Sequence, residues 1–342
     1  MSDRALGVLL LGFAGLGPDQ DHQQDMYLPA FGSHPGFEVV GVADTPAGAS
    51  SSTGHRLAAK LGVPAAASWR DGLTDPAVDV VSVCVEPGLR VEAVTAALRA
   101  GKHVLVDKPL ALTAAECREV GAVAAETGLV CLPAHHQRFH PMIGSALAAV
   151  AGGRVGLPWN VQADFLVAGG TPSEAGELAN LGVYPIDVVL ALTGQRVRQV
   201  HARITRHWHD GPADDLALLF LTHDHGVTST VSVGRMRALA DTRPAGLAVH
   251  RYRISGSHGV LDVDAARPAV AVRRAEATGA TWHGASTVGR LLDVLHAAVT
   301  AGRSSSPGPA DALHVAEIVD AARASAASGV PVELPDSEEG SR

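Results

Sequence analysis

The first 135 residues alternate short apolar runs with helical segments, and this alternation restricts the possible folds more than any other feature of the sequence. The apolar runs are bounded by Gly, Pro or Asp, and they are Ala5–Leu11, Phe37–Ala43, Val78–Val85, His103–Val106 and Leu129–Leu132. Segments of helical composition lie between them, namely Thr53–Leu61, Leu89–Ala100 and Thr113–Thr127. Runs that stay apolar without alternating predict strands buried on both faces, as in a parallel sheet covered by helices. We therefore expect a doubly wound α/β domain over residues 1–135.

The pattern changes after about residue 140. A helix is expected at Met142–Ala151, a strand at Trp159–Leu166 and a second helix near Glu174–Leu192. Strands at hairpin spacing follow, at Arg198–Thr205, Asp215–Thr222, Val227–Val233, Val249–Ser255, Val260–Val263 and Val270–Arg273. The closing helices are Val288–Ala301 and Ala310–Ser328. Consecutive strands predict an α+β domain with a large, mostly antiparallel open sheet over residues 136–335, and residues 336–342 are expected to form a frayed tail.

Length and charge limit the class of protein. A chain of 342 residues exceeds one typical core, so two domains are expected. The net charge of −8 is spread along the chain without a basic run, which disfavours nucleic acid and anionic membranes as partners. No run approaches the roughly 18 apolar residues that span a bilayer, and no secretory signal is visible, so we expect a cytoplasmic protein. Cys84, Cys117 and Cys131 are expected to be buried thiols in a reducing compartment.

A glycine-rich turn directly follows the first apolar run. Its six residues are Gly12, Phe13, Ala14, Gly15, Leu16 and Gly17. In the pattern Gly-x-Gly-x-x-Gly, the first glycine allows a tight turn, the second lets the backbone approach a pyrophosphate, and the third allows close helix–strand packing. Here Ala14 replaces the middle glycine. The turn predicts a dinucleotide site in a Rossmann domain, and the alternative is an ordinary strand–helix turn.

Asp44 ends the second apolar run. An acid at this place accepts hydrogen bonds from the ribose hydroxyls and repels a 2′-phosphate, which favours NAD over NADP. Asp44 lies 27 residues after Gly17, more than the usual spacing of about 20. The excess falls on the polar segment Pro18–Asp25, which we expect to be a solvated loop. The alternative for Asp44 is a strand-end cap.

The segment Ala100–Pro109 reads Ala-Gly-Lys-His-Val-Leu-Val-Asp-Lys-Pro. It resembles the signature of the Gfo/Idh/MocA oxidoreductase family, with Asp107 where glutamate is usual. The resemblance covers nearly the whole chain, and its other parts are the glycine turn, Val42–Asp44, Gln137–Phe139, Ile254–Gly259 and Asp311–Val319.

The resemblance implies a Rossmann domain, an open C-terminal sheet often used for oligomerisation, and a nicotinamide cofactor, NAD or NADP. The implied reaction oxidises or reduces a hydroxyl-bearing carbon of a small molecule, typically a sugar, cyclitol or related polyol, and a homo-oligomeric dimer or tetramer is expected. The implied cofactor-binding residues are the six turn residues together with Asp44, Thr45, Pro87, Lys108 and Pro109. Pro109 matches a proline that is often cis-linked in the family.

Lys108 is the catalytic lysine that the resemblance implies, at the end of a strand beside the nicotinamide. A buried lysine has a lowered pKa and can share or relay a proton. The alternative is an exposed turn lysine.

A second catalytic group is expected on the first helix of the second domain. Many family members carry Asp-x-Gly-x-x-His or Asp-x-Gly-x-His there, whereas this chain has Asn180 and Tyr184. Positions 177, 180, 184 and 187 share one helical face, so both side chains can point into one cleft, although Pro185 would kink or start a helix. In one hypothesis Tyr184 exchanges the substrate proton, Lys108 tunes it and Asn180 orients the hydroxyl. In the other, Lys108 carries the proton and Tyr184 anchors the substrate. A tyrosine packed within the helix is the alternative to both.

The expected substrate-binding residues are Lys108, His136, Arg138, Asn180 and Tyr184. Around Pro87 the family shows Thr-Pro-Asn, and only the proline is retained. Glu86 could repel phosphates or bind a substrate amine, and the sequence does not decide between them.

No metal site is expected. The pairs His135-His136, His207-x-His209 and His223-x-His225 have no acid on the same face of an extended chain. Two further functions stay open: reduction of an imine or other unsaturated group in a biosynthetic pathway, and a non-catalytic sensor that keeps the cofactor pocket.

Overall fold

The computed structural model describes residues 4–17, 20–45, 51–208, 211, 213–237, 246–266, 270–273, 278–282 and 286–335. The chain divides into two compact units. The first unit comprises Met1–His136 and Ser286–Leu313, and the second comprises Gln137–Ala285 and His314–Arg342. The chain therefore returns to the first unit near its C-terminus, which the sequence pattern did not indicate.

The first unit contains a five-stranded, entirely parallel sheet with the strand order β2-β1-β3-β4-β5. Its strands are β1 (Leu6–Leu11), β2 (Phe37–Ala43), β3 (Val80–Val83), β4 (His103–Val106) and β5 (Cys131–Pro133). The side chains of β3 and nearly all of those of β1 and β4 are buried, which explains why these runs do not alternate. The predicted doubly wound sheet is confirmed, and its strand order reverses direction between β1 and β3.

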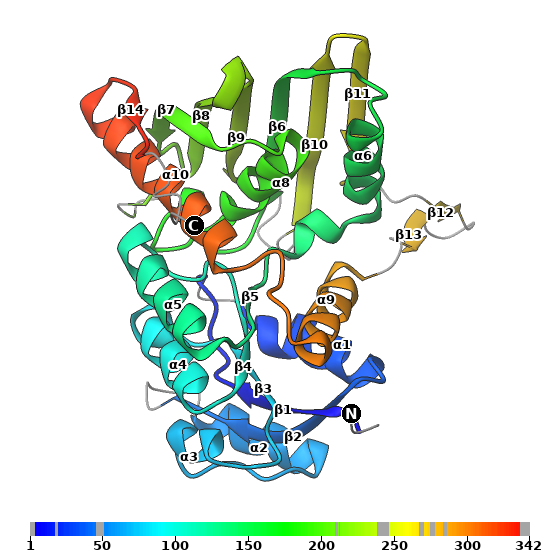
Figure 1. Cartoon of the computed structure of the whole chain (residues 1–342), viewed down its shortest axis with the longest axis vertical. Coiled ribbons are helices and arrows are strands. Elements are labelled where there is room, and N and C mark those ends of the chain that lie inside the picture. The colour runs from blue at the N-terminus through cyan, green and yellow to red at the C-terminus, as the bar shows by residue number, and fades with distance from the viewer. Residues whose placement is uncertain are drawn as a thin grey trace. The chain divides into compact units, whose positions relative to one another are not determined.

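Helices cover both faces of this sheet. They are α1 (Leu28–Ser33), α2 (Ser51–Leu61), α3 (Trp69–Leu73), α4 (Pro87–Arg99), α5 (Ala114–Thr127) and α9 (Thr287–Ala301). Figure 1 shows α4 and α5 together on one side of the sheet and α1 and α9 on the other. A capping box between Thr113 and Glu116 begins α5, and Gly128 ends it in the left-handed conformation.

The polar segment Pro18–Asp25 was predicted to be a solvated loop, and this prediction is wrong for its second half. Pro18 and Asp19 lie outside the described residues, but a π-helical turn, η1 (Gln23–Tyr27), leads directly into α1. Gln23 is fully buried. The rings of Tyr27 and Phe31 are buried in the first unit, and this burial stabilises the helical segment. The segment is short and contains Pro29 and Gly32, so its hydrophobic pattern did not predict a helix.

The second unit contains a seven-stranded sheet with the order β11-β10-β6-β9-β8-β7-β14. Its strands are β6 (Pro158–Ala168), β7 (Val197–Thr205), β8 (Leu216–His223), β9 (Thr228–Met236), β10 (Gly246–Gly256), β11 (Gly259–Asp264) and β14 (Val332–Glu333). All neighbours pair antiparallel except β6 and β9. The predicted mostly antiparallel sheet is therefore confirmed. A separate antiparallel ribbon joins β12 (Val270–Arg273) and β13 (Thr278–Trp282).

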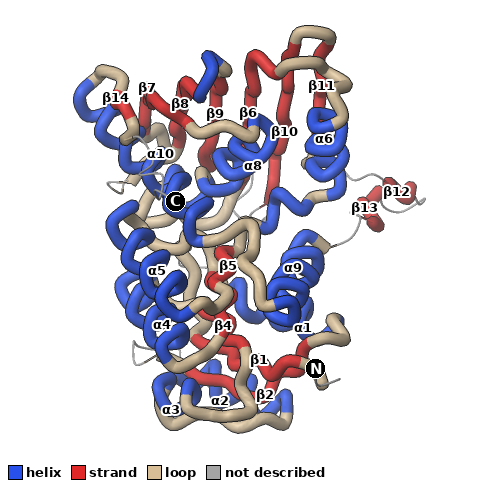
Figure 2. Tube along the Cα trace, in the orientation of Figure 1, coloured by secondary structure: helices blue, strands red, loops and turns tan. Residues whose placement is uncertain are grey.

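One face of the large sheet is covered by helices. These are α6 (Pro141–Ala151), α8 (Val183–Thr193) and the part of α10 (Pro309–Ser328) that belongs to the second unit, as Figure 2 shows. Their apolar residues and the inward-facing residues of the strands form one core. On the other face Leu218 and Phe220 of β8 are each 47% exposed, so this face of the sheet is open.

The three cysteines are free and buried, as predicted, and burial raises the pKa of Cys131 to about 12. No helix in the described part of the chain is long and apolar enough to cross a membrane.

Two buried histidines make the stability of the fold depend on pH. Burial lowers the pKa of His136 and of His250 to about 3, against about 6.5 in an unfolded chain. The unfolded chain therefore binds more protons, so the stabilisation is complete above about pH 6.5 and is lost as the pH falls toward 3. We expect each histidine to reduce the free energy of unfolding by about 2 kcal/mol between pH 7 and pH 5.

Urea unfolding at pH 8, 7, 6 and 5 measures this loss. His250→Gln should flatten the pH dependence, whereas the control His258→Gln, at an exposed turn, should keep it. An equally steep loss of stability in both variants would contradict the assignment.

Candidate functional site

The predicted cofactor residues of the first unit lie at one edge of the parallel sheet. The register aligns Leu11, Val83 and Val106 as the last paired residues of β1, β3 and β4. The backbone ladder continues one residue further, because the amide of Cys84 donates to Leu11 and that of Asp107 donates to Val83. The residues that follow the strands therefore meet at the carboxyl edge, where the strand order reverses. Ligands of open α/β sheets bind at such a crevice.

Gly12 makes the turn after β1. It adopts a φ of +77°, and a Cβ atom there would lie 2.7 Å from the carbonyl oxygen of Cys84. Its amide donates to Ala43 at 3.0 Å, and the amide of Ala14 donates to Cys84 at 2.8 Å. The amides of Phe13 and Gly15 have no hydrogen-bond partner among the described residues. Two backbone donors of this turn are therefore free to bind an anion, which fits the pyrophosphate of a dinucleotide.

The third glycine of the pattern, Gly17, was expected to allow close helix–strand packing, and this expectation is wrong. No helix starts at Gly17, because the chain first continues to η1 at Gln23. A Cβ atom at Gly17 would lie 3.0 Å from the Gln20 side chain, and the Gly17 amide donates to the Gln20 side-chain oxygen at 3.2 Å. Gly17 therefore makes room for a local side-chain cap rather than for helix–strand packing.

Two carboxylates lie beside each other after β2 and β3. Asp44 accepts a hydrogen bond from the amide of Thr45 at 2.9 Å and a longer one from Gly54 at 3.4 Å. The Thr45 hydroxyl donates to Glu86 at 3.1 Å. Burial raises the pKa of Asp44, the two amides oppose this, and the charge of Glu86 adds to it. Asp44 thus caps local backbone, as the alternative interpretation expected, and Glu86 adds a second negative charge beside it. Its contact with a ribose stays a prediction.

Lys108 follows β4 and its side chain is only 1% exposed, so it is not an exposed turn lysine. Its peptide bond to Pro109 is cis, as the family resemblance implied. Arg90 of α4, which the sequence did not single out, is also buried. Its guanidinium donates to the carbonyl oxygens of Pro109 at 2.7 Å and Val85 at 2.9 Å, and so joins the ends of β3 and β4. An arginine near the start of the helix that begins at Pro87 was the available signal.

Asp107 precedes Lys108 and is buried together with it. The hydroxyl of Tyr27 donates to its carboxylate at 2.7 Å, and Nδ1 of His22 lies 3.0 Å from the same oxygen. Burial disfavours the charged form, but His22, Lys108 and Arg90 together hold the pKa of Asp107 well below its ordinary value. His22 and Tyr27 were missed because they lie in and directly after the segment predicted to be a solvated loop.

His136 belongs to the first unit. Nδ1 of its ring lies 2.9 Å from the hydroxyl of Thr287. Since its pKa is lowered by burial, it is neutral at pH 7. Its predicted contact with substrate stays a prediction.

In the second unit, the helix predicted near Glu174–Leu192 is two helices. α7 (Glu177–Leu181) ends at Gly182, and α8 begins at Val183. Pro185 lies in the first turn of α8, where a missing amide hydrogen costs no helical hydrogen bond. Gly182 itself has helical dihedral angles, its amide donates to Leu178 and the amide of Ile186 donates to Gly182, so the chain keeps its helical course from α7 into α8. Positions 177, 180, 184 and 187 are all buried.

Asn180 and Tyr184 have different surroundings. Asn180 is fully buried, and its side-chain amide donates to the carboxylate of Glu177 at 3.2 Å. Glu177 in turn accepts a hydrogen bond from Arg235 at 2.8 Å. The ring of Tyr184 packs on Phe165 with a centroid distance of 5.5 Å. Asn180 thus belongs to a buried polar network, and Tyr184 belongs to an aromatic cluster.

Arg138, expected to bind substrate, pairs with a buried acid of the same unit. Its Nε donates to Asp187 at 2.8 Å, and a second guanidinium nitrogen contacts the other carboxylate oxygen. The pair is buried, since the Asp187 carboxylate is 1% exposed and the Arg138 side chain is 12% exposed. Such a pair fixes the guanidinium, and contact with a substrate stays a prediction.

The last of the histidine pairs does not lie on one extended strand. His209 lies outside the described residues. His223 ends β8 and bonds the Ser229 hydroxyl at 2.8 Å, whereas His225 adopts a φ of 57° in the following turn. The two rings are therefore not on one face of a strand. Within the described ranges, no group of three His, Cys, Asp or Glu residues could hold a metal ion.

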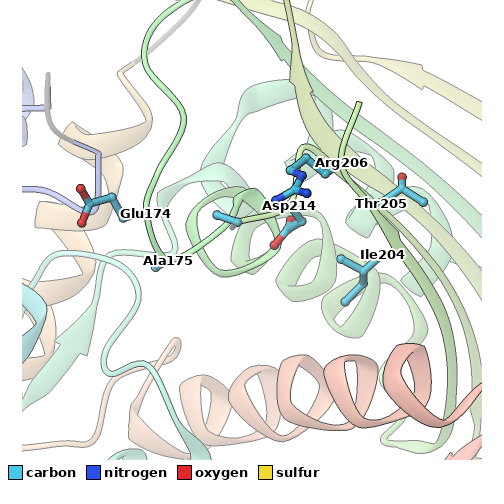
Figure 3. Close-up of a pocket in the computed structure, with 7 residues that line it drawn as sticks. Glu174, Ala175, Ile204, Thr205, Arg206 and Asp214 are labelled. Atoms are coloured by element: carbon cyan, nitrogen blue, oxygen red, sulfur yellow. The ribbon is translucent and has the colours of Figure 1, made fainter. Parts of the chain in front are cut away.

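A cavity of about 680 Å³ lies in the second unit at the end of β7. Figure 3 shows Arg206 and Asp214 beside each other in it, with Glu174 further away. Both central groups have local partners, since Asp214 accepts the amide of Leu178 at 2.8 Å and Arg206 donates to the carbonyl oxygen of Gly211. The cavity contains none of the predicted site residues, and local structure accounts for its polar lining.

Comparison with known proteins supports the same interpretation. Residues 8–135 match the model of the oxidoreductase family with an NAD-binding Rossmann fold, and residues 145–262 match the GFO/IDH/MocA C-terminal domain. A 1,5-anhydro-D-fructose reductase of Ensifer adhaerens is 38% identical over 124 residues, 36% of each chain, so this match spans about a third of that reductase. A dTDP-3,4-didehydro-2,6-dideoxy-alpha-D-glucose 3-reductase of Streptomyces violaceoruber is 29% identical over 324 residues, 87% of this chain and 91% of the reductase.

Among solved structures, GenD2 from gentamicin A biosynthesis in complex with NAD superposes with a TM-score of 0.83 at 22% identity over 97% of each chain, which shows the shared fold. The matches to both domain models agree with the two sheets of the structure. The chain therefore belongs to the Gfo/Idh/MocA family of oxidoreductases.

Proposed function

We propose that the protein is a nicotinamide-dependent dehydrogenase or reductase that interconverts a secondary alcohol and a ketone on a sugar, cyclitol or related polyol. The observation that carries the proposal is the buried amine of Lys108 at the same sheet edge as the Gly12 turn. A buried lysine needs a functional or structural reason, because desolvation of its charge is costly. Relatives whose names include sugar and inositol substrates support the substrate class.

The residues of the first unit fit a dinucleotide. The free amides of Phe13 and Gly15 would bind the pyrophosphate, and Asp44 would accept the ribose hydroxyls. Thr45, Pro87 and the remaining turn residues would line the same crevice. A bound nicotinamide supplies or accepts the hydride.

The proton of the substrate hydroxyl requires a group of this chain. Lys108 can hold or donate that proton at its Nζ atom, because a desolvated amine gives up a proton more readily than an exposed one. In the proposed site Tyr184 either exchanges the proton with the substrate or anchors the substrate. Asn180, whose side-chain amide donates to Glu177, would orient the substrate hydroxyl. His136 and Arg138 are the further proposed substrate contacts.

We also propose that NAD is preferred to NADP and that the protein is a homo-oligomer. The carboxylates of Asp44 and Glu86 lie near each other after β2 and β3. A 2′-phosphate bound beside Asp44 would be repelled by both charges. The exposed Leu218 and Phe220 on the open sheet face support self-association, because apolar side chains on such a face favour burial.

Gly12→Ala should lower the affinity for NADH at least tenfold and also lower the melting temperature. The added Cβ overlaps backbone, and a positive φ costs an alanine about 1–2 kcal/mol. Fluorescence titration with NADH and thermal unfolding measure the two effects. Gly121→Ala is the matched control, because a Cβ atom there makes only an ordinary contact at 3.7 Å within α5. Equal NADH affinity in both variants would rule out the Gly12 turn as the cofactor site.

Asp44→Ser should increase the affinity for NADPH about tenfold, and adding Glu86→Gln should increase it further, because each change removes a repelling charge. Isothermal titration with NADH and NADPH gives the ratio of affinities. A wild-type protein that binds NADPH tenfold more tightly than NADH would refute this account of Asp44.

Lys108→Ala should reduce turnover at least about 100-fold while leaving NADH affinity within a few-fold, because general acid–base groups contribute that much. Turnover is measured on scyllo-inositol, D-xylose and 1,5-anhydro-D-fructose, with Lys60→Ala on the exposed side of α2 as control. Tyr184→Phe distinguishes the two hypotheses, since full activity would leave Lys108 as the proton carrier. Cofactor binding without any turnover would instead favour a sensor.

A further inference from the structure

The carboxylate of Asp107 is buried between two side chains that no step of the proposed reaction uses. Oδ1 accepts a hydrogen bond from the Tyr27 hydroxyl at 2.7 Å, and Nδ1 of His22 lies 3.0 and 3.1 Å from the two carboxylate oxygens. Asp107 is 1% exposed, whereas the His22 side chain is 14% exposed. The contact therefore extends from the buried end of β4 toward the surface.

The π-helical turn explains why both side chains reach one carboxylate. In η1 the amide of Leu28 donates to the carbonyl of Gln23, five residues earlier, so residues five apart lie on the same side. His22 and Tyr27 have this spacing. An ordinary α-helical turn would have separated their directions by more than a hundred degrees.

Gln23 fixes the turn to the sheet. Its side-chain amide donates to the carbonyl of Ser82 at 3.3 Å, and the Ser82 hydroxyl donates back at 3.0 Å. Ser82 belongs to β3, the strand next to β4. The buried Gln23–Ser82 pair thus holds η1 against the sheet, and His22 and Tyr27 on either side of Gln23 contact Asp107.

We propose that His22 and Tyr27 are positioning residues for Lys108, acting by clamping the carboxylate of Asp107 at the end of β4. The proposal rests on the proposed function, because it assigns a purpose to a group next to the catalytic amine. A carboxylate held by two hydrogen bonds cannot rotate away, so the negative charge beside Lys108 stays at a fixed place.

Several titratable and charged groups face the Asp107 carboxylate, among them the buried thiol of Cys84. Lys108 and Arg90 supply positive charge, His22 adds to it when protonated, and the neutral His136 also lies near. Removing the Tyr27 hydroxyl leaves all of these charges in place. Tyr27→Phe is therefore the variant that isolates the clamp.

The chain has only three lysines, Lys60, Lys102 and Lys108, which allows a direct test on the full-length protein. With ¹³C-labelled lysine, the three side chains can be titrated separately by NMR. Asp107→Asn should lower the titration midpoint of Lys108, because a neighbouring negative charge is lost. Tyr27→Phe should shift it by about half a pH unit, because the carboxylate is then no longer held at a fixed place beside the amine, with Lys60 and Lys102 unchanged. A Lys108 curve that coincides with the wild type in both variants would overturn the proposal.

Steady-state kinetics of the variants provide the second test of the proposal. Tyr27→Phe and His22→Gln should lower kcat about tenfold and leave the KM for NADH within twofold, whereas His258→Gln should behave as the wild type. Asp107→Glu should be impaired because the longer side chain meets Tyr27 and His22, and a His22→Ala, Asp107→Glu double variant should recover activity to within about threefold. Failure of this rescue together with an unchanged kcat in the single variants would refute the clamp.

The two arms separate the proposals. If Lys108→Ala retained full activity, the proposed function would fall, while the NMR titration would still decide whether the clamp controls the Lys108 amine. If Tyr27→Phe failed to fold, His22→Gln at the partly exposed end would carry the same test.

Discussion

The parallel pairing of β1 with β2 and β3, and of β3 with β4, is the constraint on which the candidate site depends. Parallel strands all end at the same edge, so the side chains after them converge although they are far apart in the sequence. Gly12, Asp44, Glu86 and Lys108 come from four strand ends. Antiparallel pairing would have sent neighbouring ends to opposite edges. The sheet therefore explains why four dissimilar residues lie at one edge.

Several buried charged groups of the chain have well-defined partners. Asp107 is held by His22 and Tyr27, and Arg90 is held by two backbone carbonyls. In the second unit Glu177 pairs with Arg235 in the same way. Removing one member of a buried pair typically costs about 3–5 kcal/mol, because the other charge is left without compensation. These pairs therefore fix the geometry of their surroundings more than they increase net stability.

The chain departs from the family signature at a few positions, and the structure gives each departure a local setting. Asp107 is shorter than the usual glutamate and is reached by side chains from η1. Asn180 is neutral where an acid is common, and its side-chain amide donates to Glu177, which also accepts a hydrogen bond from Arg235. The differences thus concern how polar groups are held, while the fold and the position of the lysine are retained.

The sequence alone determined the doubly wound sheet, the antiparallel second sheet, the glycine turn and the lysine at the end of β4. These features follow from local apolar patterning and from a motif within ten residues, so no distant contact is needed to see them. It did not reveal η1, the return of α9 to the first unit or the contacts of His22, Tyr27 and Arg90. Only the tertiary structure decided these, because a polar residue is recognised as buried and paired only when its partner from another strand or helix is in place.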